Sequence, residues 1–269
     1  MKLKRVKKLL VLGIVLVVML TGCASTEAKS SGEEGERPLE GEKLVLAINA
    51  TFPPFESVEV VDGETNFIGM DIELVEKLSE KLGFTYEITD MAFAGLVGSI
   101  QSGRADFVCS GISPTAERLK NVDFSISYYY PGIAAVSRKD NPLTTIEELA
   151  DKKILVGFGT TYEMWAQTNI ENSDVKSMDG TPAVIQELKN GRGDAAILDA
   201  NQAAEFVKQN EDLQFNVLEY DDTRENSFAI AFPKDSELTS IFNAELEKML
   251  NNGEMNELVA KWCGEEFAE

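Results

Sequence analysis

Histidine is absent from the 269-residue chain, and its absence removes several kinds of chemistry at once. Histidine is the side chain that titrates near neutral pH, the general base of Ser-His triads and a frequent metal ligand. Cysteine is scarce as well, because only Cys109 and Cys263 fall within the body of the chain, too few for a thiolate zinc site. The sequence therefore argues against most hydrolase classes, and we expect neither a metal ion nor a cofactor.

Positive charge is also in short supply. The chain has 25 Lys and Arg residues against 46 Asp and Glu residues, which gives a net charge of −21. Nucleic acids and anionic lipid surfaces are themselves negative, so both would repel a chain of this charge. We therefore expect no nucleic-acid partner.

The N-terminus has the layout of an export signal. Basic residues precede the apolar run Leu9–Leu20, which is too short to span a bilayer as a helix. The run leads into Leu20-Thr21-Gly22-Cys23, which resembles the lipobox of a bacterial lipoprotein. In that pattern residues 1–22 are removed, and Cys23 becomes an acylated N-terminus that attaches the protein to the outside of the cell membrane. An ordinary cleaved signal followed by an incidental cysteine is the alternative.

Residues 23–42 are expected to form a flexible tether, because they are polar, acidic and almost free of large apolar side chains. About 225 residues follow, with no second transmembrane candidate, and they suffice for two modest lobes or one large domain. In an exported protein Cys109 and Cys263 could form a disulfide, or they could be separate buried thiols. We expect both to be reduced.

Strands and helices alternate in the first part of the body. Leu44–Ile48 is apolar on both faces, as a strand covered by helices on both sides would be. Asp71 is expected to be the N-cap of a helix that ends at Gly83. Because the connecting loops are short, a βαβαβ order predicts a parallel sheet. The remaining elements of this run are expected strands at 84–88 and 106–110 and an expected helix at 93–102.

Short repeats indicate a second, related lobe. Gly103-Arg104-Ala105-Asp106 is echoed by Gly191-Arg192-Gly193-Asp194, each before an apolar strand, and Lys153–Thr161 echoes Lys43–Thr51. Two related α/β lobes explain these echoes better than one sheet does.

Helix signals continue downstream. Thr145 with Glu148 forms a capping box, and Thr181-Pro182 begins a helix. Helical stretches within 236–262 carry an apolar face that we assign to the first lobe. The residues of that face are Leu238, Ile241, Phe242, Leu246, Met249 and Leu250.

Several motifs occur together in the body of the chain, and they are Asn49–Glu56, Gly69–Ile72, Phe93 with Gly95-Leu96, Ser110–Arg118, Val122–Ser125 and Lys261-Trp262. Over nearly all of residues 43–264, the chain resembles the extracellular solute-binding proteins of polar amino acid ABC transporters. The resemblance implies an α/β fold of the type II periplasmic-binding-protein class. In that fold each lobe is a mixed, mainly parallel sheet flanked by helices, and two crossover strands join the lobes.

The resemblance also implies how such a protein works. One polar L-amino acid binds in the cleft between the lobes, the lobes close over it, and a membrane permease recognises the closed form. We expect a monomer, with the first lobe formed by residues 43–130 and 234–269 and the second by residues 131–233.

The two charged groups of the ligand's backbone end have matching residues. Arg118 matches the position that holds the α-carboxylate, where a guanidinium makes two parallel charge-assisted hydrogen bonds. Asp199 matches the acceptor of the ammonium group, although an Asp directly after a strand can equally be a helix N-cap. Thr160 and Thr161 match carboxylate-contacting positions beside a helix N-terminus, where free amides favour an anion.

The remaining matches line the ligand. Phe52 and Phe93 match two aromatic residues that sandwich the ligand side chain, although both could be plain core residues. Asn49 stands where binders of cationic amino acids and of glutamine commonly have Asp, and it brings no charge, which weakens the case for lysine or arginine. Ser110, Gly111 and Ser113 match family positions whose polar groups line the backbone end of the ligand.

Two other functions fit the same fold. A cyclohexadienyl dehydratase-like enzyme would need a carboxylic acid in the cleft, a role that Asp199 or Glu56 would have to take. A sensor that reports amino acid to a membrane kinase would need a separate partner. Turnover of prephenate or arogenate would favour the enzyme, and saturable binding without turnover would favour transport.

Overall fold

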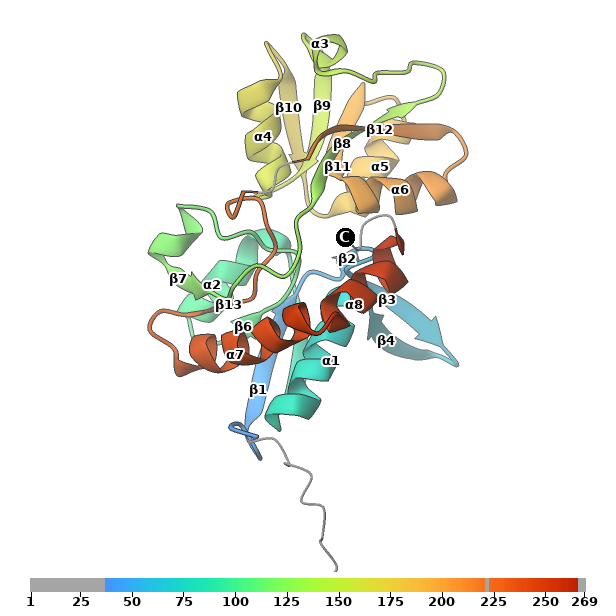
Figure 1. Cartoon of the computed structure of the whole chain (residues 1–269). Helices are drawn as coiled ribbons and strands as arrows, with labels where there is room; N and C mark the ends of the chain where they lie inside the picture. Colours follow the sequence, from blue (N-terminus) through green and yellow to red (C-terminus); the bar gives the residue numbers. More distant parts are fainter. Residues whose placement is uncertain (1–36, 221–222, 266–269) are drawn as a thin grey trace, which may run out of the picture. The chain divides into compact units, whose positions relative to one another are not determined.

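The computed structural model describes residues 37–220 and 223–265, in which two five-stranded sheets form the centres of two lobes (Figure 1). The sheets have the orders β5-β1-β6-β13-β7 and β10-β9-β11-β8-β12. In each sheet the first three strands run parallel, and the fourth runs antiparallel to both of its neighbours. The expected α/β fold with two related lobes and mixed sheets is therefore confirmed.

The first lobe has a core on each face of its sheet. Successive residues of β1 alternate between them, with Leu46 and Ile48 in one core and Ala47 in the other. Helices α1 (Met70–Leu82), α7 (Glu237–Asn251) and α8 (Glu254–Cys263) cover the first face, and α2 (Leu96–Gln101) covers the second. The strands are β1 (Lys43–Ile48), β5 (Thr85–Asp90), β6 (Phe107–Val108), β7 (Val122–Phe124) and β13 (Ala231–Pro233).

The second lobe repeats this arrangement. On one face of its sheet lie α3 (Ile146–Leu149) and α4 (Thr161–Asn169), and on the other α5 (Thr181–Lys189) and α6 (Ala200–Gln209). The capping box predicted at Thr145 and Glu148 is present at the start of α3. The strands are β8 (Gly132–Arg138), β9 (Lys153–Gly157), β10 (Asp174–Met178), β11 (Ala195–Asp199) and β12 (Leu213–Tyr220).

The Gly-x-x-Asp echoes make the same contact in both lobes. Oδ2 of Asp106 accepts from the backbone N of Val45 at 2.7 Å, and Oδ2 of Asp194 accepts from the backbone N of Lys153 at 2.9 Å. Each aspartate directly precedes a strand, β6 or β11, and therefore ties the start of that strand to its parallel neighbour, β1 or β9. Gly103 and Gly191, with φ of 67° and 69°, supply the left-handed turn before each one.

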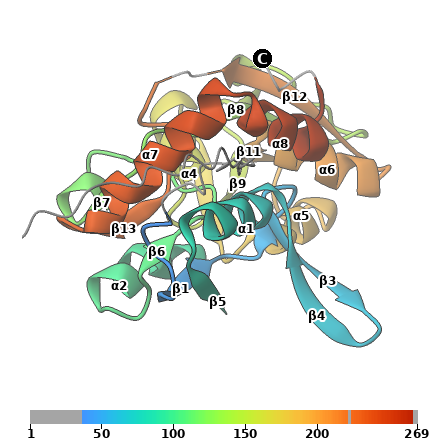
Figure 2. The same ribbon diagram turned by 60° about the horizontal axis from the view of Figure 1, so that its bottom comes forward.

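A small third sheet belongs to the first lobe's half of the chain. It consists of β2 (Thr51–Phe52), β3 (Glu56–Val61) and β4 (Glu64–Ile68), and Figure 2 shows the β3–β4 hairpin projecting beyond the helices. Two 3₁₀ turns complete the elements, η1 (Phe93–Gly95) and η2 (Arg118–Lys120).

The chain crosses between the lobes twice, and the two crossings lie side by side. Tyr129 and Phe228 form an antiparallel bridge in which the backbone N of Phe228 donates to the carbonyl of Tyr129 at 2.8 Å. The second crossing ends earlier than expected. The boundary at 233 was wrong, because β13 pairs with β6 and β7 and belongs to the first lobe.

Two local predictions about the first lobe were also wrong. Asp71 is not an N-cap but the second residue of α1, whose first amides instead donate to the carbonyls of Pro54 and Phe55. Residues 37–42 are not part of a free tether, because Leu39 is buried in the core and its backbone N donates to the carbonyl of Leu82 at 2.9 Å.

The C-terminal helices pack as predicted, with one exception. Phe242, Leu246 and Met249 are buried in the core of the first lobe, whereas Leu250 is 37% exposed.

Cys109 and Cys263 are free thiols in the structure. No helix within residues 37–220 and 223–265 has the length and apolar character needed to cross a bilayer. The lipobox, Cys23 and the first part of the tether lie outside the described residues.

Candidate functional site

A pocket with about 550 Å³ of empty space, part of which is open to solvent, lies between the two sheets, at the ends of their parallel strands. Such an edge is where α/β proteins bind ligands, because the loops after neighbouring strands converge there. The first lobe contributes Asn49, Thr51, Phe52, Phe93, Gly111, Ser113 and Arg118 to its lining. The second contributes Gly157, Phe158, Thr160, Thr161, Tyr162, Gly180, Thr181, Ile197, Leu198 and Gln202.

Arg118 is the one charged side chain among these lining residues. Its Nη1 donates to the carbonyl of Ser113 at 2.9 Å, and its Nη2 donates across the cleft to the carbonyl of Gly159 at 2.9 Å. The guanidinium carbon lies 5.2 Å from the ring centroid of Phe93, a distance typical of a cation–π contact. Burial lowers the pKa of Arg118 to about 10, so the side chain remains charged at neutral pH. A fixed cation therefore faces the pocket.

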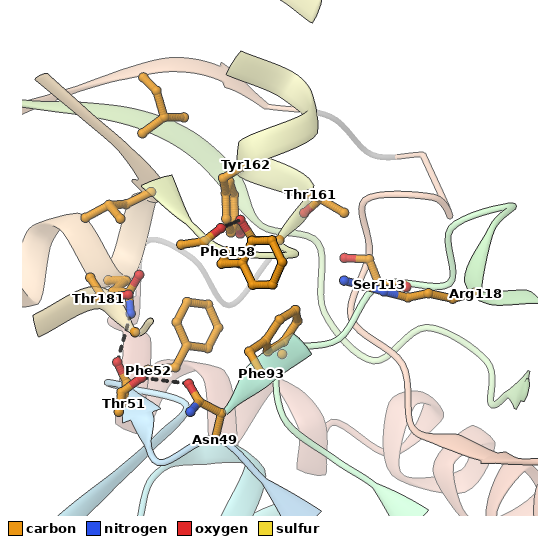
Figure 3. Close-up of a pocket in the computed structure, with 17 residues that line it drawn as sticks. Asn49, Thr51, Phe52, Phe93, Ser113, Arg118, Phe158, Thr161, Tyr162 and Thr181 are labelled. Atoms are coloured by element: carbon orange, nitrogen blue, oxygen red, sulfur yellow. Dashed lines mark hydrogen bonds between the residues drawn. The ribbon is translucent and has the colours of Figure 1, made fainter. Parts of the chain in front are cut away.

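Aromatic rings form the middle of the pocket. Figure 3 shows Phe52, Phe93 and Phe158 between Arg118 with Ser113 at one end and Thr51 with Asn49 at the other. The ring of Phe52 stacks on that of Phe55 with centroids 4.9 Å apart, which holds it in place. Phe158 is 53% exposed and leaves an apolar face open to the pocket. Such rings suit the flat or aliphatic part of a ligand.

The end of the pocket opposite Arg118 is polar and neutral. Nδ2 of Asn49 donates to the carbonyl of Met91 at 2.8 Å, and its Oδ1 accepts from Oγ1 of Thr51 at 2.7 Å. From the second lobe, Nε2 of Gln202 donates to the carbonyl of Thr51 at 3.4 Å. Amide and hydroxyl groups, rather than carboxylates, are therefore presented to a ligand here.

The N-terminus of α4 opens onto the pocket. Thr160 is its N-cap, with Oγ1 accepting from the backbone N of Glu163 at 3.2 Å, and Thr161 is its first residue. Both are among the residues that line the pocket. A helix N-terminus favours an anion, because its first amides have no partner within the helix.

Two predicted site residues do not line the pocket. Ser110 is buried, and its Oγ accepts from the backbone N of Asn49 at 2.9 Å while donating to Oε1 of Glu56 at 2.6 Å. Asp199 is the N-cap of α6, with Oδ1 accepting from the backbone N of Gln202 at 2.8 Å. Burial raises the pKa of Asp199 to about 7. The structure thus shows the capping contact that was the alternative for Asp199.

The other eight predicted residues are brought together as lining of one pocket. Sequence reasoning missed the other nine lining residues, among them Thr51, Phe158, Tyr162 and Gln202. Thr51 lies inside the Asn49–Glu56 motif, and the repeat of 43–51 at 153–161 could have marked Phe158 as part of the matching loop. Nothing in the sequence marked Gln202.

The pocket has no donor set for a metal ion. Its described lining contains no carboxylate and no thiol, and the chain has no histidine. Hydrogen-bonding groups, aromatic rings and one guanidinium are what a ligand would meet.

Comparisons with known proteins match nearly the whole of the described chain. The profile of the family described as bacterial extracellular solute-binding proteins, family 3, matches residues 44–265. The chain is 36% identical to an arginine-binding extracellular protein of Bacillus subtilis over 256 residues. This alignment covers 94% of this chain and 96% of that one. It is 30% identical over 268 residues to an L-cystine-binding protein of Escherichia coli, with 98% of each chain covered.

Solved structures show the same similarity. An amino acid ABC transporter substrate-binding protein from Streptococcus pneumoniae, bound to L-arginine, is 34% identical with a TM-score of 0.76, over 84% of this chain and 95% of that one. An ancestral arginine-binding protein has been solved with glutamine bound. It is 34% identical with a TM-score of 0.74, over 82% of this chain and 98% of that one.

Proposed function

Because the chain belongs to family 3 of the bacterial extracellular solute-binding proteins, we propose that it binds a polar L-amino acid in the pocket between its lobes and delivers it to an ABC transporter permease for import. The observation that carries this proposal is the placement of Arg118. It is the one charged side chain in the described lining, it lies at one end of the pocket, and it contacts both lobes.

The backbone end of the ligand fits the Arg118 end of the pocket. A guanidinium held by two carbonyls keeps further N–H donors for a carboxylate, and the α4 N-terminus beside Thr160 and Thr161 adds free amides. The ammonium group would then be received by carbonyl and hydroxyl groups near Ser113. A role for Asp199 in binding it would fall to Oδ2, because Oδ1 accepts from the backbone N of Gln202 in the α6 cap, whereas Oδ2 faces the hydroxyl of the pocket residue Tyr162 at 3.5 Å.

The side-chain end of the pocket is neutral, and this bears on the choice of ligand. Relatives bind arginine and cystine. Here Asn49, Thr51 and Gln202 offer hydrogen bonds without a negative charge, and Phe52 and Phe158 offer ring faces. We propose that the ligand's side chain is polar and is held by neutral groups, so that no ion pair at this end selects a cationic amino acid.

The enzyme alternative has less support. It requires a carboxylic acid in the cleft, yet neither Glu56 nor Asp199 lines the pocket, and both are fully buried. General acid catalysis needs the proton donor within hydrogen-bonding reach of the leaving group. The matched relatives are binding proteins, and we propose that this protein, too, acts without turnover.

The lipobox-like sequence bears on where in the cell the protein works. We propose that Cys23 is acylated and that the protein works on the outer side of the cell membrane, beside its permease. Such an anchor keeps the binding protein close to the transporter in cells where it would otherwise diffuse away.

A thermal-shift screen of the twenty common amino acids and cystine against residues 37–269 tests the proposal. A ligand present at about 100 times its dissociation constant adds roughly 2.7 kcal/mol to the free energy of unfolding, so its melting shift is readily measured. We expect one polar amino acid, or a small group of them, to raise the melting temperature. No shift with any amino acid would contradict the proposal.

A further inference from the structure

Beneath the ligand-facing loops of the first lobe lie two fully buried carboxyl groups, those of Glu56 and Asp71. Glu56 is the first residue of β3, and Asp71 is the second residue of α1. Within the described residues neither forms an ion pair with Lys or Arg. Two neighbouring buried carboxylates without a cation would be costly, because desolvation and mutual repulsion both oppose ionisation.

Each carboxyl group has one oxygen in use and one without a partner. Oδ2 of Asp71 accepts from the backbone N of Gly111 and from the hydroxyl of Tyr128, both at 2.7 Å. Oε1 of Glu56 accepts from Oγ of Ser110 at 2.6 Å. Oε2 of Glu56 and Oδ1 of Asp71 are buried, and neither has a hydrogen-bond donor among the described groups. The two side chains are within hydrogen-bonding reach of each other.

A single proton between them satisfies both orphaned oxygens. We propose that Glu56 and Asp71 share one proton at neutral pH, with Oε2–H of Glu56 donating to Oδ1 of Asp71. We further propose that this pair holds the loops at Asn49 and Gly111 in their ligand-binding positions.

The proton belongs on Glu56 rather than on Asp71. Asp71 lies in the first turn of α1, where the helix dipole favours a negative charge, and it receives two donors where Glu56 receives one. Burial and the charge of Asp71 raise the pKa of Glu56 well above its ordinary value. Burial raises the pKa of Asp71 as well, but the backbone N of Gly111 and the hydroxyl of Tyr128 oppose that rise, so Asp71 is the member of the pair that ionises first.

The surrounding titratable groups favour keeping this proton. Cys109 follows β6, Tyr128 lies on the first crossing, and burial raises the pKa of both, so they stay protonated at neutral pH. Asp90, at the end of β5, raises the pKa of Glu56 further through its charge. None of these neighbours is a cation that could compensate the negative charge in place of the proton.

The pair reaches the pocket through two short connections. Ser110 donates to Glu56 and accepts from the backbone N of Asn49, and Gly111 donates its backbone N to Asp71. Asn49 and Gly111 both line the pocket. A Cβ at Gly111 would come within 2.3 Å of the ring of Phe52, so the loop also sets where that ring can lie. Glu56 and Asp71 are therefore positioning residues. This role rests on the proposed function, whereas the shared proton is independent of it.

Infrared spectroscopy of the ligand-free protein tests the shared proton. The spectra are taken above pH 8, where Asp199, with its pKa of about 7, is ionised. We expect a carbonyl band of a protonated carboxyl group that disappears in Glu56→Gln. The band should persist in Glu59→Gln, which alters an exposed glutamate on the same strand. Absence of the band, or its persistence in Glu56→Gln, would overturn the shared proton.

Binding of the amino acid found in the screen tests the positioning role. A glutamine at 56 keeps an acceptor for Ser110 and gains a donor for Asp71, so we expect its affinity to stay within about threefold of the parent protein. Ser110→Ala removes the acceptor for the backbone N of Asn49 and the donor to Oε1 of Glu56, while both carboxyl groups stay in place. We expect its affinity to fall by about tenfold.

The pH profile separates positioning from a general structural role. Raising the pH far enough to ionise Glu56 should weaken binding by the parent protein and leave binding by Glu56→Gln unchanged. Parallel pH profiles, or a loss of more than about tenfold in Glu56→Gln at neutral pH, would overturn the positioning role. Because the infrared measurement needs no ligand, its result stands even if no amino acid binds.

Discussion

At the scale of single residues, Asn49 bears on ligand choice. Its side chain lies at the neutral end of the pocket, held by the carbonyl of Met91 and by Oγ1 of Thr51. Asn49→Asp keeps the oxygen that accepts from Thr51 and adds a negative charge to a lining that has none among its described residues. We expect the ratio of arginine affinity to glutamine affinity to rise by about tenfold, because hydrogen bonds between charged groups are stronger than neutral ones.

Calorimetry with both amino acids measures this ratio. Asn66→Asp, an identical charge change on the exposed strand β4, is the matched control and should leave the ratio unchanged. If Asn49→Asp also leaves it unchanged, Asn49 does not face the ligand side chain.

At the scale of elements, the sequence predicts best where a contact is local. The Gly-x-x-Asp units are recognisable because a left-handed glycine and a strand-starting aspartate lie within four residues of each other. The apolar face of α1 is predictable for the same reason, since Val75, Leu78 and Leu82 repeat at helical spacing and all are buried.

Predictions fail where the deciding partner is distant in sequence. Asp71 has the residue type of an N-cap, but the backbone at 54–55 satisfies the first amides of α1, and the carboxyl group is used by Gly111 instead. Leu39 is a single apolar residue in an acidic stretch, and the core that buries it forms only when distant parts of the first lobe come together. For the same reason β13 could not be assigned to a lobe before its pairing with β6 and β7 was known.

The cap of α6 gives a pH-dependent prediction. Asp199 has its pKa raised to about 7 by burial, so its ionisation costs stability as the pH rises from its unfolded pKa of about 3.9 towards 7. Asparagine caps a helix as well as aspartate does but does not titrate. We therefore expect Asp199→Asn to gain stability relative to the parent protein over this pH range and to show no further gain above about pH 8.

Denaturant unfolding at several pH values checks this, and calorimetry on the same variant separates the two roles of Asp199. Unchanged ligand affinity would leave it as a cap alone, whereas a loss would support the ammonium-binding role. A stability difference that does not vary with pH would contradict the titration.

At the scale of the whole molecule, two hydrogen bonds across the cleft connect the lobes. Arg118 donates to the carbonyl of Gly159, and Gln202 donates to the carbonyl of Thr51. Moving a population from mostly open to mostly closed, from about 1:99 to 99:1, needs about 5.5 kcal/mol of differential binding. In the proposed binding mode, a carboxylate on Arg118 and a side chain between rings of both lobes would supply this difference, because both lobes contribute to each interaction.

Membrane attachment is tested at Cys23. Cys23→Ala removes the acyl attachment point, so we expect an unprocessed protein or one shed into the medium. Cell fractionation with a salt wash measures retention, and Cys263→Ser, at the far end of the chain, should be retained like the parent protein. Equal retention of Cys23→Ala would contradict lipid anchoring.

Calorimetric titration of Arg118→Ala with the amino acid identified by screening tests the carboxylate site most directly. Removing the guanidinium leaves the ligand's carboxylate without its partner in a closed cleft, a change that costs about 3–5 kcal/mol. The affinity should therefore fall more than about a hundredfold, while the unliganded protein keeps its melting temperature. Arg192→Ala, which removes an exposed arginine paired with Glu187, should bind like the parent protein. Unchanged affinity in Arg118→Ala would contradict the assignment of the amino acid's carboxylate to this pocket.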